Sequence, residues 1–196
     1  MNLITQIFAV VGVLGTVIST VIAVIQYRRV SVWKKRLTWD DSLRTSTKLL
    51  RNIEQSGWIP DIVLGLGRSG GIWGGWLAGN LGSLPFSVID DKYPEVSFPA
   101  GAKILRVLRE EYPLMSKMLV VEGASSRGET INQFRDEFSV ILQGIEIRFA
   151  VLYMNPASSA KIDYVGEVGP EPWPLRFPWH STDRYRPYLR DLFSRE

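Results

Sequence analysis

The sequence predicts an α/β domain built on a parallel sheet and preceded by one transmembrane α-helix. Between residues 38 and 168, short apolar runs alternate with amphipathic stretches, which is the pattern of strands joined by crossover helices. Ahead of them lies an uncharged run of 22 residues, Ile4–Ile25. At about 1.5 Å rise per residue, this run is long enough to span the ~30 Å hydrocarbon core of a bilayer.

The charges that flank the uncharged run predict its orientation. No lysine or arginine precedes it, whereas five follow it directly: Arg28, Arg29, Lys34, Lys35 and Arg36. The positive-inside rule therefore places the N-terminus outside and the following domain in the cytoplasm. We expect a single-pass transmembrane helix over residues 1–27, a basic juxtamembrane linker over 28–37 and one folded domain over 38–196. A cleaved signal peptide or a buried core helix is the alternative, and the basic cluster either binds anionic lipid or only sets topology.

The composition excludes several kinds of site. The 196 residues contain no cysteine and a single histidine, so disulfides, thiolate metal sites and histidine-based metal clusters are excluded within one chain. The formal net charge of +3 is too small to indicate a nucleic-acid partner. We expect no metal-binding cluster of side chains and no nucleic-acid partner.

The first half of the domain begins with a helix and a buried strand. Thr38 and Asp41 have the spacing of a capping box, which predicts a helix running to about Gln55. The apolar run Ile62–Leu66 is typical of a buried parallel strand. It leads into the glycine-rich turn Gly65–Gly71 and a helical stretch that ends near residue 81.

The remaining elements follow the same alternation. We expect strands at Phe86–Ile89, Met118–Val121, Ile145–Leu152 and Tyr164–Val168. A polar, proline-containing loop is predicted over residues 90–101, and a second loop over residues 122–130. The helix after it has one apolar face and ends at Gly144. That face consists of Ile131, Phe134, Phe138, Ile141 and Leu142.

Two loops at the predicted carboxyl ends of strands have the composition of anion sites. Backbone N–H groups and the positive end of a helix bind phosphate at such junctions. Residues 125–130 contain two serines, Arg127 and Gly128, with Thr130 at the start of the helix. Arg68–Gly71 presents the same arrangement with one guanidinium. Each loop alone is equally compatible with a simple strand-to-helix turn; as a pair they favour phosphate or nucleotide binding.

Four segments carry a resemblance to a known family. They read LTWDD (37–41), DIVLGLGRSGGIWGGWLAGNLG (61–82), MLVVEGASSRGETI (118–131) and EPWPLRFPW (171–179). Over about residues 37–179 the chain resembles the type I phosphoribosyltransferases, and it is most similar to their bacterial xanthine–guanine branch. The resemblance implies that family's parallel-sheet fold, phosphoribosyl pyrophosphate (PRPP) as the donor, Mg²⁺ on the pyrophosphate and a homo-oligomer.

The resemblance also implies roles for single residues. Arg68, Ser69, Gly70 and Gly71 would bind pyrophosphate, and Trp173 would stack on the base. The 5′-phosphate would be bound by the loop residues Ser125, Ser126, Arg127, Gly128, Glu129 and Thr130.

The chain departs from the family pattern at its acidic positions. The family has two adjacent acids on the ribose hydroxyls, and here they read Glu122-Gly123. Ser126 replaces a third acid near the reacting centre, and Asn155 replaces the lysine that contacts the base. Glu122 and Ser126 are therefore the candidate catalytic residues. One hypothesis is a membrane-anchored phosphoribosyltransferase acting on a nucleobase-like acceptor. The alternative is a catalytically degenerate nucleotide-sensing or effector module that signals through its membrane helix.

Overall fold

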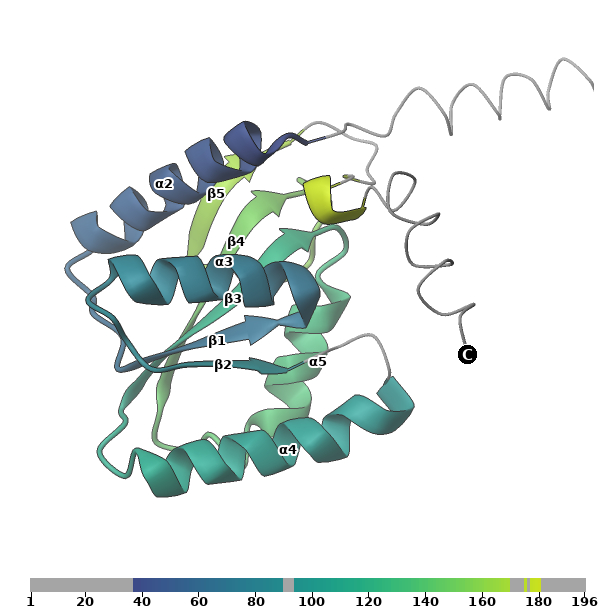
Figure 1. Ribbon diagram of the computed structural model, residues 1–196. Coiled ribbons are helices and arrows are strands. Elements are labelled where there is room, and N and C mark those ends of the chain that lie inside the picture. The colour runs from purple at the N-terminus through teal and green to yellow at the C-terminus, as the bar shows by residue number, and fades with distance from the viewer. Residues whose placement is uncertain (1–36, 90–93, 170–174, 176, 181–196) are drawn as a thin grey trace, which may run out of the picture.

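A five-stranded parallel sheet forms the centre of the domain in the computed structural model, which describes residues 37–89, 94–169, 175 and 177–180 (Figure 1). The strand order is β2-β1-β3-β4-β5, and every neighbouring pair is parallel. The predicted parallel sheet is confirmed. The strands are β1 (Ile62–Leu66), β2 (Phe86–Ile89), β3 (Lys117–Ser125), β4 (Glu146–Met154) and β5 (Tyr164–Val168).

Helices cover both faces of this sheet. In Figure 1, α2 and α3 lie across one face, and α4 and α5 lie on the other. The central strands β1, β3 and β4 are covered on both sides, so their residues are apolar in both directions, which explains the continuous apolar runs in the sequence. The helices are α2 (Trp39–Gln55), α3 (Gly67–Asn80), α4 (Pro94–Glu111) and α5 (Glu129–Phe138), and a short 3-10 helix, η1, spans Pro178–His180.

The core is divided by the sheet into two clusters. Val121 points to the α2 and α3 side, where it packs with Leu49 and Leu77. Its neighbour Val120 points the other way and packs with Phe134 of α5. This alternation is the two-residue period of a strand with both faces buried.

The first described helix begins as the sequence predicts. The Thr38 side chain accepts a hydrogen bond from the Asp41 backbone N–H at 3.0 Å, and the Asp41 carboxylate accepts one from the Thr38 N–H at 3.0 Å. This reciprocal capping box satisfies two N–H groups that the helix itself leaves without partners.

Four predicted elements have other bounds in the structure. The helix expected to end at Gly144 ends at Phe138, with residues 139–144 in turns, and the strand expected over Ile145–Leu152 spans Glu146–Met154. The expected loop over residues 90–101 contains the start of α4, which begins at Pro94 and continues through Pro99 and Gly101. Pro94 lies in the first turn, where the missing N–H of proline costs nothing, whereas Pro99 is the sixth residue of α4 and removes one hydrogen bond from the helix. The third strand is also longer than predicted, because β3 pairs with β4 as far as Ser125.

The predicted membrane segment lies outside the described residues. Residues 1–36 carry both the expected transmembrane helix and nearly all of the expected basic linker. Among the helices of residues 37–180 that the structure describes, none combines the length and the apolar character needed to cross a membrane.

Candidate functional site

The junction between β3 and α5 has the geometry of an anion site. β3 ends at Ser125, and α5 begins at Glu129 after a three-residue turn. Gly128 precedes the helix with φ +87°, a left-handed conformation that favours glycine, and no side chain caps the helix. The first N–H groups of a helix have no partner within it, so those of α5 are available at the carboxyl end of the strand.

A cavity of about 290 Å³ opens at this junction. It brings together the whole predicted 5′-phosphate loop and the candidate catalytic residues. Two carboxylates, those of Glu122 and Glu129, and one guanidinium, that of Arg127, line it. The Arg127–Glu129 ion pair is 3.6 Å long and highly exposed, so a ligand phosphate can compete for Arg127 at little cost. The residues that line the cavity are Glu122, Ala124, Ser125, Ser126, Arg127, Gly128, Glu129 and Thr130.

A second loop, which follows β4, holds the predicted 5′-phosphate loop in place. The Ser125 and Ser158 hydroxyls are hydrogen-bonded at 2.8 Å. Ser159 donates to the Arg127 carbonyl twice, from its backbone N–H at 3.0 Å and from its hydroxyl at 2.9 Å. The sequence analysis missed Ser158 and Ser159. Their place in the chain could have identified them. They follow β4, which lies beside β3, so they reach the same edge of the sheet as the Ser125–Thr130 loop.

Asn155 lies beside the phosphate loop and is buried. Its backbone N–H donates to the Ser125 carbonyl at 2.9 Å, which continues the β3–β4 pairing beyond the strands. Its Oδ1 accepts a hydrogen bond from the Ala157 N–H at 2.8 Å. The Asn155 carbonyl is therefore used to shape its own turn, a common role of asparagine in loops. Trp173, the predicted base-stacking residue, lies outside the described residues.

The predicted pyrophosphate loop is helical. Arg68, Ser69, Gly70 and Gly71 form the first turn of α3, which begins immediately after β1, and they do not form an extended loop. Arg68 is exposed and Gly70 is buried. No side chain caps α3, so its first N–H groups point toward the same edge of the sheet as those of α5. β1 and β3 are neighbours, which places the two predicted anion sites at adjacent strand ends.

Close packing explains why Gly123 is a glycine. A Cβ atom added there would lie 2.2 Å from the Ser69 Cβ and 3.4 Å from the ring of Phe177. Any side chain at this position requires α3 to move away from β3. The second acid of the family signature is therefore incompatible with this packing of the α3 N-terminus.

The fold was compared with known proteins. No protein-family model matches the sequence, and no curated protein matches it. Among solved structures, a purine phosphoribosyltransferase from Pyrococcus horikoshii is 25% identical with a TM-score of 0.57, over 74% of this chain and 93% of that one. The xanthine-guanine-hypoxanthine phosphoribosyltransferase of Helicobacter pylori is 16% identical with a TM-score of 0.55, over 82% and 99%. The chain has a phosphoribosyltransferase-like fold.

A third similar structure is a hypothetical protein from Neisseria gonorrhoeae with bound ppGpp. It is 16% identical with a TM-score of 0.55, over 81% of this chain and 97% of that one. The match covers 93%, 99% and 97% of the three neighbours' own lengths, so the phosphoribosyltransferase-like fold accounts for nearly all of each of them.

An aromatic cluster closes the same edge of the phosphoribosyltransferase-like domain. The rings of Phe177 and Trp179 are stacked with their centroids 4.6 Å apart. Phe177 also contacts Tyr153 of β4, and Trp179 contacts Trp73 of α3 and Trp39 of α2. The sequence alone allows the aromatic segment over residues 173–179 to bind a base or to cap the sheet edge. Phe177 and Trp179 contact side chains of the domain itself, so these two residues cap the sheet edge.

Proposed function

We propose that this domain binds a phosphorylated ribose, either PRPP or a nucleotide, with a phosphate group in the cavity between β3 and α5. The observation that carries the proposal is the turn over Ser126–Gly128, which brings the uncapped start of α5 into the same cavity that Glu122 lines. The helix start suits a phosphate, and the Glu122 carboxylate is an acceptor for ribose hydroxyl groups.

The structural neighbours support the class of ligand. Two of them are phosphoribosyltransferases, whose substrates carry a phosphorylated ribose, and one has bound ppGpp. Phosphate-binding groups at two adjacent strand ends, those of β1 and β3, suit a ligand with two separated phosphate groups.

We favour binding without efficient transfer. The packing of Gly123 against Ser69 leaves Glu122 as the only signature acid, and Ser126 cannot offset positive charge on the reacting ribose as a carboxylate would. The described residues contain no cluster of three acidic or histidine side chains that could hold a metal. Mg²⁺ is often bound by ligand phosphates with one or two carboxylates, a donor set that Glu122 and Glu129 fit. The chemistry that Mg²⁺ supplies in such sites is neutralisation of charge on the leaving pyrophosphate.

A binding experiment with the full-length protein tests this proposal. The midpoint of thermal unfolding is measured with ribose 5-phosphate, PRPP, purine nucleotides and ppGpp, each with and without Mg²⁺. We expect at least one of them to stabilise the protein and Ser126→Ala to weaken its affinity by about tenfold, as for a hydrogen bond to a charged group. Ser139→Ala at the other end of α5 is the matched control. The proposal is wrong if none of these ligands binds.

Pyrophosphate release then separates the two forms of the proposal. The protein is incubated with PRPP, Mg²⁺ and a panel of nucleobases. Binding without pyrophosphate release identifies a sensing or effector module, whereas release that depends on a base identifies an active phosphoribosyltransferase.

We further propose that residues 1–27 anchor the protein in a membrane with the domain on the cytoplasmic side. The support is the uncharged run Ile4–Ile25 and the cations that follow it. Retention of the full-length protein in membranes after alkaline carbonate extraction tests the anchor. Release into the supernatant, or protection of the domain from protease added to the cytoplasmic side, contradicts it.

A further inference from the structure

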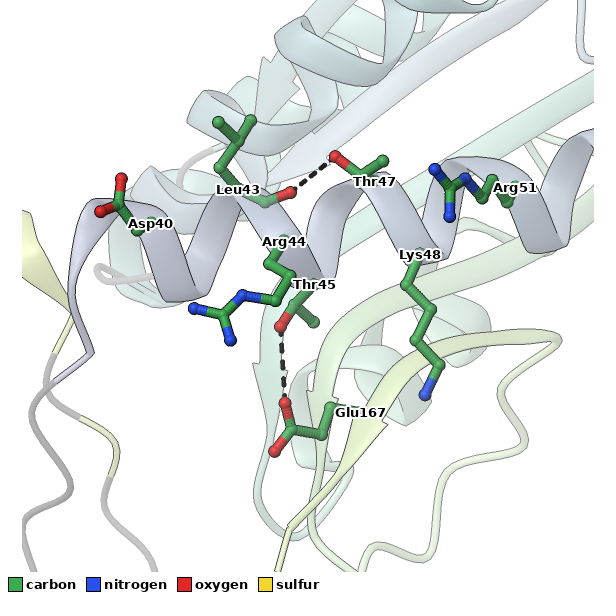
Figure 2. A pocket seen from close by; sticks show the side chains of 8 residues that line it. All are labelled: Asp40, Leu43, Arg44, Thr45, Thr47, Lys48, Arg51 and Glu167. Atoms are coloured by element: carbon green, nitrogen blue, oxygen red, sulfur yellow. Dashed lines mark hydrogen bonds between the residues drawn. The ribbon is translucent and has the colours of Figure 1, made fainter.

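The outward face of α2 lies outside the proposed ligand site. Figure 2 shows a hollow along this face, with Leu43, Arg44, Lys48 and Arg51 projecting from the helix and Glu167 approaching from β5. Its volume is about 570 Å³. The residues that line it are Asp40, Leu43, Arg44, Thr45, Thr47, Lys48, Arg51 and Glu167.

Apolar and basic side chains share this face. The opposite side of α2 packs in the core through Leu49 and Ile53, which are fully buried. On the outward side, Trp39 is 55% exposed and Leu43 is 46% exposed, although both are large and apolar. Exposed apolar groups beside cations are typical of helices that lie on a membrane surface.

The positions of the charges favour an extended anionic surface over a small anion. Arg44 is exposed, and its guanidinium lies 3.5 Å from the Asp41 carboxylate. Neither Lys48 nor Arg51 has an ion pair with another described residue. Glu167 lines the hollow opposite α2, and it accepts a hydrogen bond from Thr45 at 3.5 Å. A phosphate ion inside the hollow would be repelled by this carboxylate. A membrane surface is wide enough to contact Arg44, Lys48 and Arg51 together, because all three project from the helix.

A short separation along the sequence keeps α2 close to the predicted membrane segment. α2 begins at Trp39, and the 13 residues between Ile25 and Trp39 include five cations. Long cationic side chains place their charge at the headgroups while their stems cover apolar surface. Trp39, at the end of α2 that follows this segment, is of a type enriched at the membrane interface.

We propose that the outward face of α2 docks on the anionic phospholipid surface of the membrane through Arg44, Lys48 and Arg51, with Leu43 and Trp39 at the headgroup level. The partner is the lipid surface itself. This proposal rests on the membrane anchor and not on the ligand site. It orients the domain, because α2 faces the bilayer while α4 and α5, on the other face of the sheet, point toward the cytoplasm.

The absence of cysteine from the chain makes a direct test possible. A single cysteine is introduced at Thr47, in the middle of the outward face, and is labelled with a fluorophore. The matched control is a cysteine at Val140, which is 79% exposed and follows α5 on the opposite side of the sheet. Energy transfer to an acceptor-labelled lipid is measured for the full-length protein in vesicles of phosphatidylcholine, with or without phosphatidylglycerol.

We expect high transfer from position 47 and low transfer from position 140 in vesicles with phosphatidylglycerol. Each cation near an anionic surface changes the equilibrium between docked and undocked domain by about fivefold. The double variant Lys48→Gln, Arg51→Gln therefore lowers the ratio of docked to undocked domain by roughly 25-fold. Lys103→Gln with Arg106→Gln removes the same charge from exposed positions on α4 and leaves the ratio unchanged. Salt at about 1 M, where the Debye length is about 3 Å, abolishes the difference between the two vesicle types.

Three results would each overturn the docking proposal. The first is equal energy transfer from positions 47 and 140, and the second is an equal effect of the α2 and α4 charge variants. The third is loss of docking in glycerol phosphate at constant ionic strength, which would make a soluble phosphate compound the occupant of the hollow. Retention after carbonate extraction is measured on the same samples, so failure of the anchor is distinguished from failure of the docking face.

Discussion

Replacing Gly123 by aspartate restores the second acid of the phosphoribosyltransferase signature, and the structure predicts that this change destabilises the domain. The new Cβ would lie 2.2 Å from the Ser69 Cβ. Carbon atoms pack at about 3.5–4.0 Å, so α3 and β3 must separate by more than 1 Å. Overpacking of this kind costs about 1–3 kcal/mol, and a carboxylate beside the buried Phe177 adds to it. We expect a loss of about 2–4 kcal/mol, or a fall in Tm of about 5–15 °C.

Thermal unfolding of a small set of variants isolates the contact. Gly123→Ala carries the same Cβ without the charge, and we expect about half to all of the effect. Ser69→Gly removes the opposing Cβ, so Ser69→Gly combined with Gly123→Ala should be more stable than the sum of the two single changes predicts, by about 1–2 kcal/mol. Gly79→Ala is the control, because a Cβ at Gly79 meets nothing within 4 Å and should stabilise α3 by up to about 1 kcal/mol.

The predicted clash at position 123 is refuted if Gly123→Asp unfolds at the wild-type temperature. It is equally refuted if the loss of stability is unchanged in the Ser69→Gly background. Recovery of pyrophosphate release in a stable Gly123→Asp variant would show instead that the site has lost an acid that the fold accommodates.

Further predictions concern other described contacts. Gly128→Ala places a Cβ on a residue with φ +87° and 2.5 Å from the Ala160 backbone nitrogen. We expect the free energy of unfolding, measured by thermal unfolding, to fall by at least about 1–2 kcal/mol, and ligand binding to weaken. The Trp39 and Trp179 rings, 5.5 Å apart, should show a coupling of about 0.5–1.5 kcal/mol in a double-mutant cycle of alanine variants. Hydrogen bonds from Ser116 lower the pKa of Asp61, so Asp61 stabilises the folded state fully above about pH 4 and progressively less as the pH falls through its lowered pKa. Asp61→Asn should therefore cost stability in urea unfolding at pH 7, and the difference should shrink in acid.

Local patterns were enough to predict much of the sheet. The strands Ile62–Leu66, Phe86–Ile89 and Tyr164–Val168 have the predicted bounds because each is a short apolar run closed by glycine, proline or polar residues. The capping box at Thr38 depends only on residues three positions apart, so it too could be predicted.

Long-range contacts account for what the sequence did not reveal. Pro99 and Gly101 favour a loop locally, yet α4 continues through them and buries Leu105 completely against the sheet. Burial of Leu105 stabilises α4 by more than the roughly 1 kcal/mol that a glycine costs in a helix. This burial depends on the tertiary fold, so the local sequence does not show it. The support that Ser158 gives to Ser125 spans 33 positions, and no local pattern indicates it.

The pairing of α2 with β5 has a consequence for biosynthesis. The Asn52 side chain donates to the Val165 carbonyl at 3.1 Å, so the first described helix completes its contacts with the last strand of the sheet. During translation the contacts of α2 with β5 cannot form until more than a hundred further residues have been made. If the N-terminal segment inserts into the membrane as proposed, it would be in place long before the domain can close. The fold would then be completed by a nascent chain already held at the bilayer.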